Sequence, residues 1–470
     1  MSAAGPGTGT LGDLSEPIHV HVVGIGGAGM SAIATVLQAM GHTVTGSDLK
    51  DSAVTDRLRR SGINVEIGHQ AGNVGTADAL TVSTAVAESN PEVVEARRRG
   101  VPVLPRAHTL AAITGLRRCI AVAGTHGKTT TASMLALILV EAGMRPSFLI
   151  GGEVNEIGTN AVWDSGEWIV VEADESDGTF LSLVPDIAIV TNVEADHLDH
   201  YGTFAAMRAA FEEFVASARS RRVVGGDDPV AAEIGRATGA DVVGTTSEST
   251  FRMIDLDLAR SSLSFELSAP GGNDLGRLVV PVPGLHNAKN AAVAAVAALA
   301  AGVPFDAAAR ALARFAGVAR RFEFRGSVGG VTFVDDYAHL PSEVRAALAA
   351  ARNGNWRRVV AVFQPHRYSR TAELWAEFGT AFGDADVVVV ADVYGAGEAP
   401  VPGVSGRLVA DAVRRSVPQM PVYYVAGRGD LGRTVGALLE PGDLCCTLGA
   451  GDLTSLPDEL LSEAVWVNGG

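Results

Sequence analysis

The stretch Gly124-Thr125-His126-Gly127-Lys128-Thr129-Thr130 decides how the middle of this chain folds. The apolar run 119–123 precedes it and predicts a buried strand, and residues 132–139 follow it with helical spacing. Glycines at a strand-to-helix turn allow backbone N–H groups to converge on phosphate oxygens at the positive end of the helix dipole. Lys128 is then expected to reach the β- and γ-phosphates, and the Thr129 hydroxyl to bind Mg²⁺. The stretch predicts a site for a nucleoside triphosphate.

The spacing of the two glycines is shorter than in the general phosphate loop. Only Thr125 and His126 separate Gly124 from Gly127, where the general loop has four residues. A glycine turn with an incidental lysine is the alternative interpretation. Lysine is scarce in this chain: of its 37 lysines and arginines, only Lys50, Lys128 and Lys289 are lysines. A lysine at this place therefore favours the phosphate loop.

Length and composition exclude several classes of protein. A chain of 470 residues is too long for one hydrophobic core, so we expect two to four domains. The net charge of −16 argues against sequence-independent binding of nucleic acid, and three cysteines are too few for a disulfide framework. Residues 1–16 lack the features of a secretion signal, and the longest apolar tract, 288–303, predicts a buried helix. We expect a cytoplasmic protein that neither inserts into a membrane nor binds nucleic acid.

Short β-rich runs alternate with helical segments from Ile18 onward, which is typical of α/β layers around mostly parallel sheets. The alternation restarts near residues 119 and 331, with a β-rich excursion over 252–282 between them. We therefore predict three α/β domains after a disordered N-terminus. The predicted ranges are a disordered segment at 1–17, a Rossmann-like domain at 18–117, a central domain of the P-loop ATPase type at 118–319, and a Rossmann-like C-terminal domain at 320–470.

The first domain opens with a second glycine motif. A strand over 19–23 leads into G-x-G-x-x-G at Gly24, Gly26 and Gly29, and Asp48 follows 19 residues after Gly29. This is the dinucleotide fingerprint, with Asp48 on a ribose hydroxyl. The motif indicates a diphosphate near a helix N-terminus more reliably than it indicates NAD, and tight glycine packing without a ligand is the alternative.

Polar side chains follow several further apolar strands. Acid-rich turns at 172–177 and 194–199 close two such strands after the phosphate loop, and carboxylates with an imidazole there suit Mg²⁺. Asn287 and Asn290, three residues apart, share one helical face and can pair with adenine. Arg367 and Arg370 are able to present two forked guanidinium groups to an anion.

Seven short motifs now stand in order along the chain: G-T-H-G-K-T-T, E-A-D-E-S-D, N-x-E-A-D-H-L-D, H-N-x-x-N-A, R-R-F-E, D-D-Y-A-H-L-P and F-Q-P-H-R-Y-S-R-T. Together they resemble the Mur ligases of peptidoglycan synthesis, from about residue 18 to the C-terminus. The resemblance implies a ligase that uses ATP and Mg²⁺, with Mn²⁺ as a substitute, and UDP-N-acetylmuramate as substrate. The lactyl carboxylate would become an acyl phosphate that an amine attacks, releasing ADP and phosphate. The last motif favours L-alanine as the amine over an intact tripeptide.

The resemblance also implies a role for individual residues. The residues implied to hold the UDP moiety are Gly24, Gly26, Gly27, Gly29, Met30, Ser31, Asp48, His69, Ser83 and Thr84. The residues implied to bind ATP are Gly124, Thr125, His126, Gly127, Lys128, Thr129, Thr130, Asn287, Asn290, Arg321 and Asp336. The metal ligands implied are Thr129, Glu172 and His197. The residues implied to face the muramoyl carboxylate and alanine are Tyr337, His339, His366, Arg367 and Arg370. The implied catalytic set is Lys128, Glu172, His197, Asp336, His339, Arg367 and Arg370, with His339 and Asp336 both open as the general base.

Three positions depart from the family pattern. Phe211 stands in the region where several sister ligases carry a carbamylated lysine, so we expect no such modification. Leu340 replaces a second histidine, and residues 106–110 read R-A-H-T-L in place of R-A-E-M-L.

The rival interpretations are a recycling ligase that adds a tripeptide, an NAD-dependent oxidoreductase and a non-catalytic ATP-binding scaffold.

Overall fold

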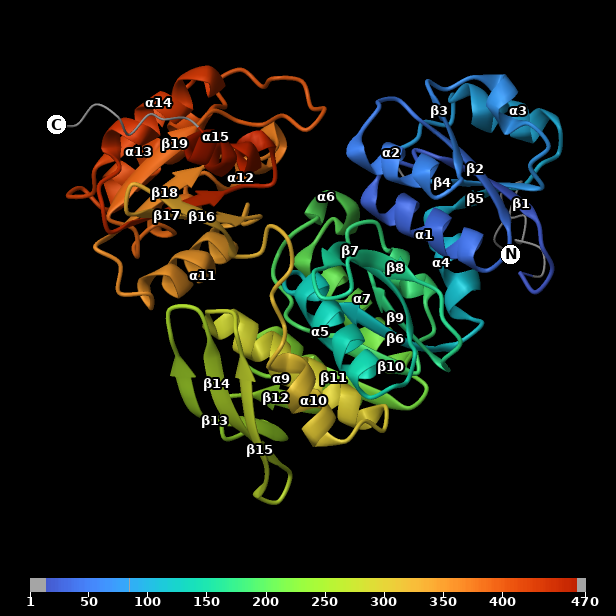
Figure 1. The fold of residues 1–470 in the computed structure, drawn as a ribbon, viewed down its shortest axis with the longest axis horizontal. Helices are drawn as coiled ribbons and strands as arrows, with labels where there is room; N and C mark the ends of the chain where they lie inside the picture. The colour runs from blue at the N-terminus through green and yellow to red at the C-terminus, as the bar shows by residue number, and fades with distance from the viewer. Residues whose placement is uncertain (1–13, 84, 463–470) are drawn as a thin grey trace. The chain divides into compact units, whose positions relative to one another are not determined.

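The computed structural model describes residues 14–83 and 85–462, and Thr84 and the predicted disordered residues 1–13 lie outside this part of the chain. The described residues form three sheets, each covered by helices (Figure 1). By contact they fall into two compact units. The first contains the first sheet and most of the second, and the second contains the third sheet together with residues 255–265 and 278–288. The α/β architecture with three sheets agrees with the expectation from the sequence, whereas the domain boundaries near 117 and 320 stay predictions.

The first sheet is entirely parallel, with the strand order β3-β2-β1-β4-β5. Its strands are β1 (His19–Val23), β2 (Thr43–Asp48), β3 (Asn64–Ile67), β4 (Ala79–Val82) and β5 (Val103–Pro105). Its helices are α1 (Ala28–Ala39), α2 (Ala53–Arg60), η1 (Ala71–Val74), α3 (Pro91–Arg98) and α4 (Arg106–Thr114). Because β1 runs parallel between β2 and β4, the turns after these strands meet at one edge of the sheet.

The second sheet has ten strands in the order β15-β14-β13-β12-β11-β10-β6-β9-β7-β8. Its strands are β6 (Arg118–Ala123), β7 (Ser147–Val154), β8 (Thr159–Val162), β9 (Trp168–Glu172), β10 (Ile187–Val190), β11 (Arg221–Gly225), β12 (Asp241–Gly244), β13 (Phe251–Leu258), β14 (Leu263–Ala269) and β15 (Asn273–Val280). Its helices are α5 (Lys128–Glu141), η2 (Thr179–Ser182), α6 (Leu198–Tyr201), α7 (Phe204–Ala216), α8 (Pro229–Thr238), α9 (Leu285–Ala300) and α10 (Phe305–Leu312). Strand β6 pairs in parallel with β9 and with β10, which places the phosphate loop at the centre of the sheet.

The third sheet has the order β16-β17-β21-β18-β19-β20, and only its edge strand β16 is antiparallel. Its strands are β16 (Glu323–Val328), β17 (Val331–Asp336), β18 (Arg358–Phe363), β19 (Val387–Ala391), β20 (Val422–Val425) and β21 (Asp443–Leu448). Its helices are α11 (Pro341–Arg352), α12 (Tyr368–Leu374), η3 (Glu377–Thr380), α13 (Gly406–Ser416), α14 (Arg428–Leu438), η4 (Asp452–Ser455) and α15 (Leu456–Ser462).

The apolar patterns of the sequence correspond to buried elements. Helix α5 is buried from Thr130 to Leu139, and the alanines of the tract at 288–298 are almost fully buried within α9. Strands β18, β19 and β21 consist of buried residues almost throughout, as expected for strands covered on both faces. Among the helices that the structure describes, none is both long and apolar enough to cross a bilayer.

Phe211, at which we expect no carbamylated lysine, is a core residue in this structure. Its side chain is fully buried on α7, and its ring packs edge-on against Phe180 with 5.2 Å between the ring centres. We expect Phe211→Ala to lower the free energy of unfolding by about 3–5 kcal/mol, because it removes a buried aromatic ring and leaves a cavity. Chemical denaturation would measure this change.

The matched control is Glu213→Ala, an exposed residue of the same helix. It should change the free energy of unfolding by less than about 0.5 kcal/mol. Equal losses in the two variants would contradict the core assignment of Phe211.

Candidate functional site

The phosphate loop is a glycine turn that only glycine can form. Gly124 and Gly127 have φ values of 135° and 81°, in the left-handed region that other residues rarely adopt. A Cβ atom at Gly124 would lie 2.0 Å from Thr191 Oγ1, and one at Gly127 would lie 2.5 Å from Asn290 Oδ1. Gly127 is the N-cap of α5, so the loop ends where backbone N–H groups point toward an anion.

The turn after β10 braces this loop. His126 N donates to Asn192 Oδ1 at 2.9 Å, and Thr191 Oγ1 donates to the carbonyl of His126 at 2.5 Å. Glu194 N donates to Thr125 Oγ1 at 2.9 Å. The loop conformation is therefore fixed before any ligand binds, which reduces the ordering cost of binding.

Lys128, the first residue of α5, points back over the loop. Its Nζ donates to the carbonyl of Gly124 at 2.6 Å and forms an ion pair with Glu175 Oε1 at 2.7 Å. Burial raises the pKa of the Glu175 carboxyl to about 7, although the charge of Lys128 acts in the opposite direction. The E-A-D-E-S-D motif contains Glu175, but the sequence assigned it no role.

The candidate metal ligands are only partly brought together. Thr129 Oγ1 lies 3.1 and 3.0 Å from the two carboxylate oxygens of Glu172, and the Gly151 N–H donates to Glu172 Oε2 at 2.8 Å. His197 Nε2 instead lies 3.3 Å from Asp196 Oδ2. In the part of the chain that the structure describes, no group of three His, Cys, Asp or Glu side chains could hold a metal ion. A hydroxyl and a carboxylate held side by side are nevertheless hard oxygen donors of the kind that Mg²⁺ takes.

Arg106 joins the acid-rich turn to the first glycine motif. Its Nη2 lies 2.7 Å from Asp174 Oδ2 and 3.1 Å from Asp177 Oδ2. Burial raises the pKa of Asp174, but the charge of Arg106 and hydrogen bonds from Ser176 outweigh it and lower the pKa to about 2. A Cβ atom at Gly29 would lie 3.0 Å from Arg106 Nη1, so the guanidinium group also lies against the glycine motif. The sequence pattern around Arg106 predicted no function for this residue.

The first glycine motif is held by the end of β2. Gly26 N donates to Asp48 Oδ2 at 2.9 Å, so in this structure Asp48 shapes the turn. Gly24 has a φ of 76°, and a Cβ there would lie 3.7 Å from Ser83 Oγ. His69, in the loop after β3, is the other polar candidate at this edge, and its Nδ1 lies 3.0 Å from Ser47 Oγ.

The remaining candidates of this motif lie in or beside helix α1. Gly27 is the N-cap of α1, and Gly29 is the second residue of the helix. Met30 and Ser31 are almost fully buried. Thr84 lies outside the described residues.

The two candidate asparagines of α9 have different surroundings. Asn290 packs against Gly127 of the phosphate loop, as the close approach of its Oδ1 shows. Asn287 Nδ2 donates to the carbonyl of Pro283 at 2.7 Å, which is a local bond at the start of the helix. Both side chains are buried to more than nine-tenths.

Asp336, at the end of β17, is a buried acceptor of backbone hydrogen bonds. It accepts from Phe322 N at 2.7 Å and from Ala338 N at 2.8 Å. Burial raises the pKa of the Asp336 carboxyl to about 6, with the Arg321 charge acting in the opposite direction. The Arg321 guanidinium lies 5.1 Å from the ring centre of Tyr337, so Arg321, Asp336 and Tyr337 lie close together.

Aromatic and imidazole rings gather at the same edge of the third sheet. The rings of Tyr337 and His339 are 5.4 Å apart, those of His339 and His366 are 5.9 Å apart, and His366 stacks on Tyr394 at 5.8 Å. Arg370 Nη1 lies 3.4 Å from His366 Nδ1. Burial, His339 and the nearby arginines lower the pKa of His366 to about 4, and burial also lowers the pKa of His339. Both imidazoles are therefore neutral at neutral pH.

Arg367 is the N-cap of helix α12 and has an unusual backbone conformation. Its φ is 69°, which a residue with a side chain seldom adopts. Its N–H donates to the carbonyl of Tyr394 at 2.8 Å, which holds the turn in this conformation. Non-glycine residues with such a φ are often found where a side chain must be aimed at a ligand.

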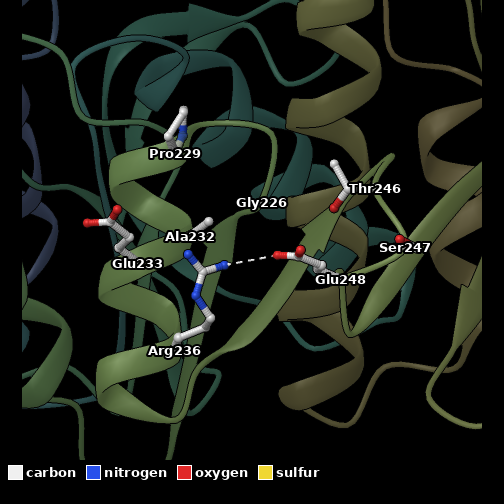
Figure 2. Close-up of a pocket in the computed structure, with 8 residues that line it drawn as sticks. All are labelled: Gly226, Pro229, Ala232, Glu233, Arg236, Thr246, Ser247 and Glu248. Carbon is white, nitrogen blue, oxygen red and sulfur yellow. Dashed lines mark hydrogen bonds and ion pairs between the residues drawn. The ribbon is translucent and has the colours of Figure 1, made fainter.

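A surface groove of about 300 Å³ lies between α8 and the segment that follows β12 of the second sheet (Figure 2). The side chains of Arg236 and Glu248 face each other across it with 3.4 Å between Nη1 and Oε2. It contains none of the residues that the sequence singled out. The groove is lined by Gly226, Pro229, Ala232, Glu233, Arg236, Thr246, Ser247 and Glu248.

Three family models match successive parts of the chain. The descriptions are "Mur ligase family, catalytic domain" for residues 19–118, "Mur ligase middle domain" for 122–298 and "Mur ligase, glutamate ligase domain" for 320–451. The first and third matches contain the first and third sheets, and the second match contains the second sheet except for the start of β6.

Curated relatives are similar over nearly the whole chain. The UDP-N-acetylmuramate–L-alanine ligase of Anaeromyxobacter sp. (strain Fw109-5) is 45% identical over 455 residues, which cover 95% of this chain and 98% of the relative. The protein of the same name from Geobacter sulfurreducens is 45% identical over 451 residues, with 94% and 97% covered.

Solved structures agree with this similarity. The UDP-N-acetylmuramate–alanine ligase of Thermotoga maritima has a TM-score of 0.81 at 29% identity, covering 94% of this chain and 98% of that one. A murein peptide ligase from Psychrobacter arcticus has a TM-score of 0.69 at 25% identity, covering 96% and 99%.

Glu175→Gln should change how stability depends on pH. The folded pKa of about 7 lies above the ordinary value of 4.5, so the folded state binds this proton more tightly than the unfolded state. In the wild type, the stabilising contribution of Glu175 to the free energy of unfolding is therefore complete below about pH 4.5 and is lost as the pH rises to about 7. Glutamine does not titrate, so the variant does not lose stability in this way.

Urea unfolding of both proteins at about pH 5 and about pH 7.5 measures this effect. The free energy of unfolding of Glu175→Gln, relative to the wild type, should increase between the two pH values. A difference that does not depend on pH would contradict the raised pKa.

Proposed function

The chain belongs to the Mur ligase family, and from this premise we infer that it joins L-alanine to UDP-N-acetylmuramate with the conversion of ATP to ADP and phosphate. The observation that supports an ATP-dependent reaction is the position of Lys128, at the N-terminus of α5 and next to a preformed glycine loop. The choice of L-alanine rests on the similarity to the curated relatives, which extends over nearly the full chain.

The chemistry follows from the low reactivity of a carboxylate toward an amine. We propose that a lactyl carboxylate oxygen attacks the γ-phosphorus of ATP, and that the bond from this phosphorus to the ADP oxygen breaks. The alanine amine then attacks the acyl carbon, and phosphate leaves with the carboxylate oxygen that it had acquired. Lys128 would neutralise charge on the transferring phosphoryl group and so lower the barrier.

Thr129 and Glu172 would hold Mg²⁺, and His197 is the third proposed ligand. The paired hydroxyl and carboxylate oxygens support the first two. Bound Mg²⁺ neutralises phosphate charge in reactions of this type. Glu172 is itself held by the Gly151 N–H, which fixes the direction of its carboxylate. We propose that Mn²⁺ can replace Mg²⁺.

The ring cluster of the third sheet would receive the muramoyl carboxylate and the incoming alanine. We propose this role for Tyr337, His339, His366, Arg367 and Arg370. A neutral imidazole accepts a proton, so His339 suits the removal of a proton from the alanine ammonium group. Asp336 already accepts two backbone N–H groups, which favours a structural or ATP-contacting role over that of the base.

The other ligand contacts remain proposals of the same kind. ATP would be bound by the phosphate loop, residues 124–130, together with Asn287, Asn290, Arg321 and Asp336. UDP-N-acetylmuramate would be bound by the glycine motif, residues 24–31, together with Asp48, His69 and Ser83.

The organisation and location of the protein are also proposed. We propose a nucleotide-sugar domain at 18–117, an ATP domain at 118–319 and an amino-acid domain at 320–470. We further propose a cytoplasmic location and no nucleic-acid partner, in keeping with the net charge of −16.

Release of phosphate from ATP in the presence of UDP-N-acetylmuramate tests the proposal. L-alanine should support release, whereas the tripeptide used by recycling ligases should not. Release with the tripeptide alone would favour the recycling reaction, which the likeness to a murein peptide ligase makes the second candidate. Release that needs NAD would contradict both.

Lys128→Ala should lower turnover about 10²-fold or more, because the charge of Lys128 acts on the transferring phosphoryl group. Turnover at saturating substrates is the measurement. The control Arg208→Ala removes a half-exposed cation of α7 that pairs with Glu233 of α8, and this variant should retain wild-type turnover. Retention of more than half of the wild-type rate by Lys128→Ala would refute the role of the lysine.

Arg370→Lys should lower kcat clearly while the affinity for ATP stays within about threefold, or roughly 0.7 kcal/mol. Lysine keeps the charge but loses the forked geometry that suits a carboxylate or an oxyanion. Steady-state kinetics and calorimetry with ATP measure the two quantities. Arg345→Lys, at an exposed position of α11, serves as the control and should leave both unchanged. Loss of ATP affinity with normal turnover at saturating ATP would move Arg370 to the nucleotide site.

A further inference from the structure

Glu92, the second residue of α3, carries a fully buried carboxylate that has four polar side chains as neighbours. We call Glu92 with His21, Ser47, His69 and Asn73 the Glu92 cluster. A buried carboxylate is costly unless hydrogen bonds compensate it. An acidic residue in the first turn of a helix is ordinary, so the sequence pattern does not single out Glu92.

One side of the Glu92 cluster holds the first glycine motif. Ser47 Oγ donates to Glu92 Oε2 at 2.6 Å. The carbonyl of Ser47 accepts from Gly24 N at 2.8 Å and from Ile25 N at 3.0 Å. The next residue, Asp48, accepts from Gly26 N. Fixing Ser47 therefore fixes the turn that is proposed to bind the diphosphate.

The other side of the cluster holds the loop after β3. Asn73 Nδ2 donates to Glu92 Oε1 at 2.6 Å and to the carbonyl of Gly68 at 3.0 Å. Gln70 N donates to Glu92 Oε1 at 3.4 Å. His69 thus lies between Gly68, which Asn73 binds, and Gln70, which Glu92 binds directly.

The cluster also determines which nitrogen of His69 carries a proton. His69 Nδ1 lies 3.0 Å from Ser47 Oγ and 3.2 Å from Glu92 Oε2. The carboxylate only accepts, and the Ser47 hydroxyl already donates to it, so Nδ1 must be the donor. A neutral imidazole with its proton on Nδ1 has an unprotonated Nε2, and among the described residues no hydrogen bond involves Nε2 of His69.

Glu92 remains ionised under working conditions. Burial raises its pKa, but the nearby His21 imidazole and hydrogen bonds from Ser47 and Asn73 outweigh burial and lower the pKa to about 2. His21 Nε2 lies 3.8 Å from Glu92 Oε2, and His21 Nδ1 lies 2.8 Å from Thr45 Oγ1. The donors to this carboxylate therefore come from β2 and from the segment after β3, and His21 of β1 lies beside them.

We propose that Glu92 is a positioning residue of the nucleotide-sugar site, which fixes the glycine turn through Ser47 and holds His69 with Nδ1 protonated and Nε2 free to accept a hydrogen bond. The donor would be a ribose hydroxyl or the uracil N–H of the uridine. This inference rests on the proposed function, because it concerns the binding of UDP-N-acetylmuramate.

Calorimetry of the full chain with UDP-N-acetylmuramate tests the inference. Glu92→Gln keeps the shape of the side chain but replaces one acceptor oxygen with a donor. We expect its affinity for UDP-N-acetylmuramate to fall at least tenfold while its affinity for ATP stays within twofold. Glu95→Gln, on the same helix, removes an ion pair with Arg98 and should leave both affinities unchanged. Wild-type affinity in Glu92→Gln would overturn the inference, and a wild type that does not bind UDP-N-acetylmuramate would instead overturn the proposed function.

Two further measurements separate positioning from a general structural role. Nitrogen NMR of the wild-type His69 ring should show the proton on Nδ1, and a proton on Nε2 would overturn the inference even if Glu92→Gln failed to fold.

In a His69→Ala background, Glu92→Gln should weaken binding less than it does alone, because part of its effect acts through His69. Fully additive losses would contradict the transmission through His69.

Discussion

The parallel pairing of β6 between β9 and β10 is the constraint on which the central site depends. Ile120 of β6 lies opposite Val170 of β9 and Ile187 of β10, so the three strands end at the same edge of the sheet. The turns that follow them therefore meet, although they are separated by tens of residues in the chain. The ion pair of Lys128 with Glu175 and the contact of Thr129 with Glu172 are consequences of this register.

The same principle organises the other two sheets. In the first sheet, β1 and β2 run in parallel, so the glycine motif and Asp48 meet at one edge. In the third sheet, β17 and β18 both run parallel to β21, and their ends carry Asp336 and the segment that contains His366. Ligands of α/β proteins commonly bind at such edges.

Much of the fold and part of the site could be predicted from the sequence. Alternating apolar runs and glycine turns indicated the α/β sheets, and the phosphate loop lies where the sequence placed it. The partners of individual charges could not be predicted, because they depend on strand order and not on local pattern. Glu175 as the partner of Lys128, Arg106 between two acidic residues and the Glu92 cluster are examples. For His197 the sequence predicted a metal ligand; its Nε2 lies 3.3 Å from Asp196 Oδ2, and the metal role stays a prediction.

The origin of the oxygen in the released phosphate tests the central claim most directly. UDP-N-acetylmuramate labelled with ¹⁸O in its lactyl carboxylate would be ligated to L-alanine, and the phosphate analysed by mass spectrometry. Activation of the carboxylate as an acyl phosphate predicts that each phosphate carries one oxygen from that carboxylate. Phosphate without the label would contradict the account, because ATP would then be cleaved without activating the carboxylate.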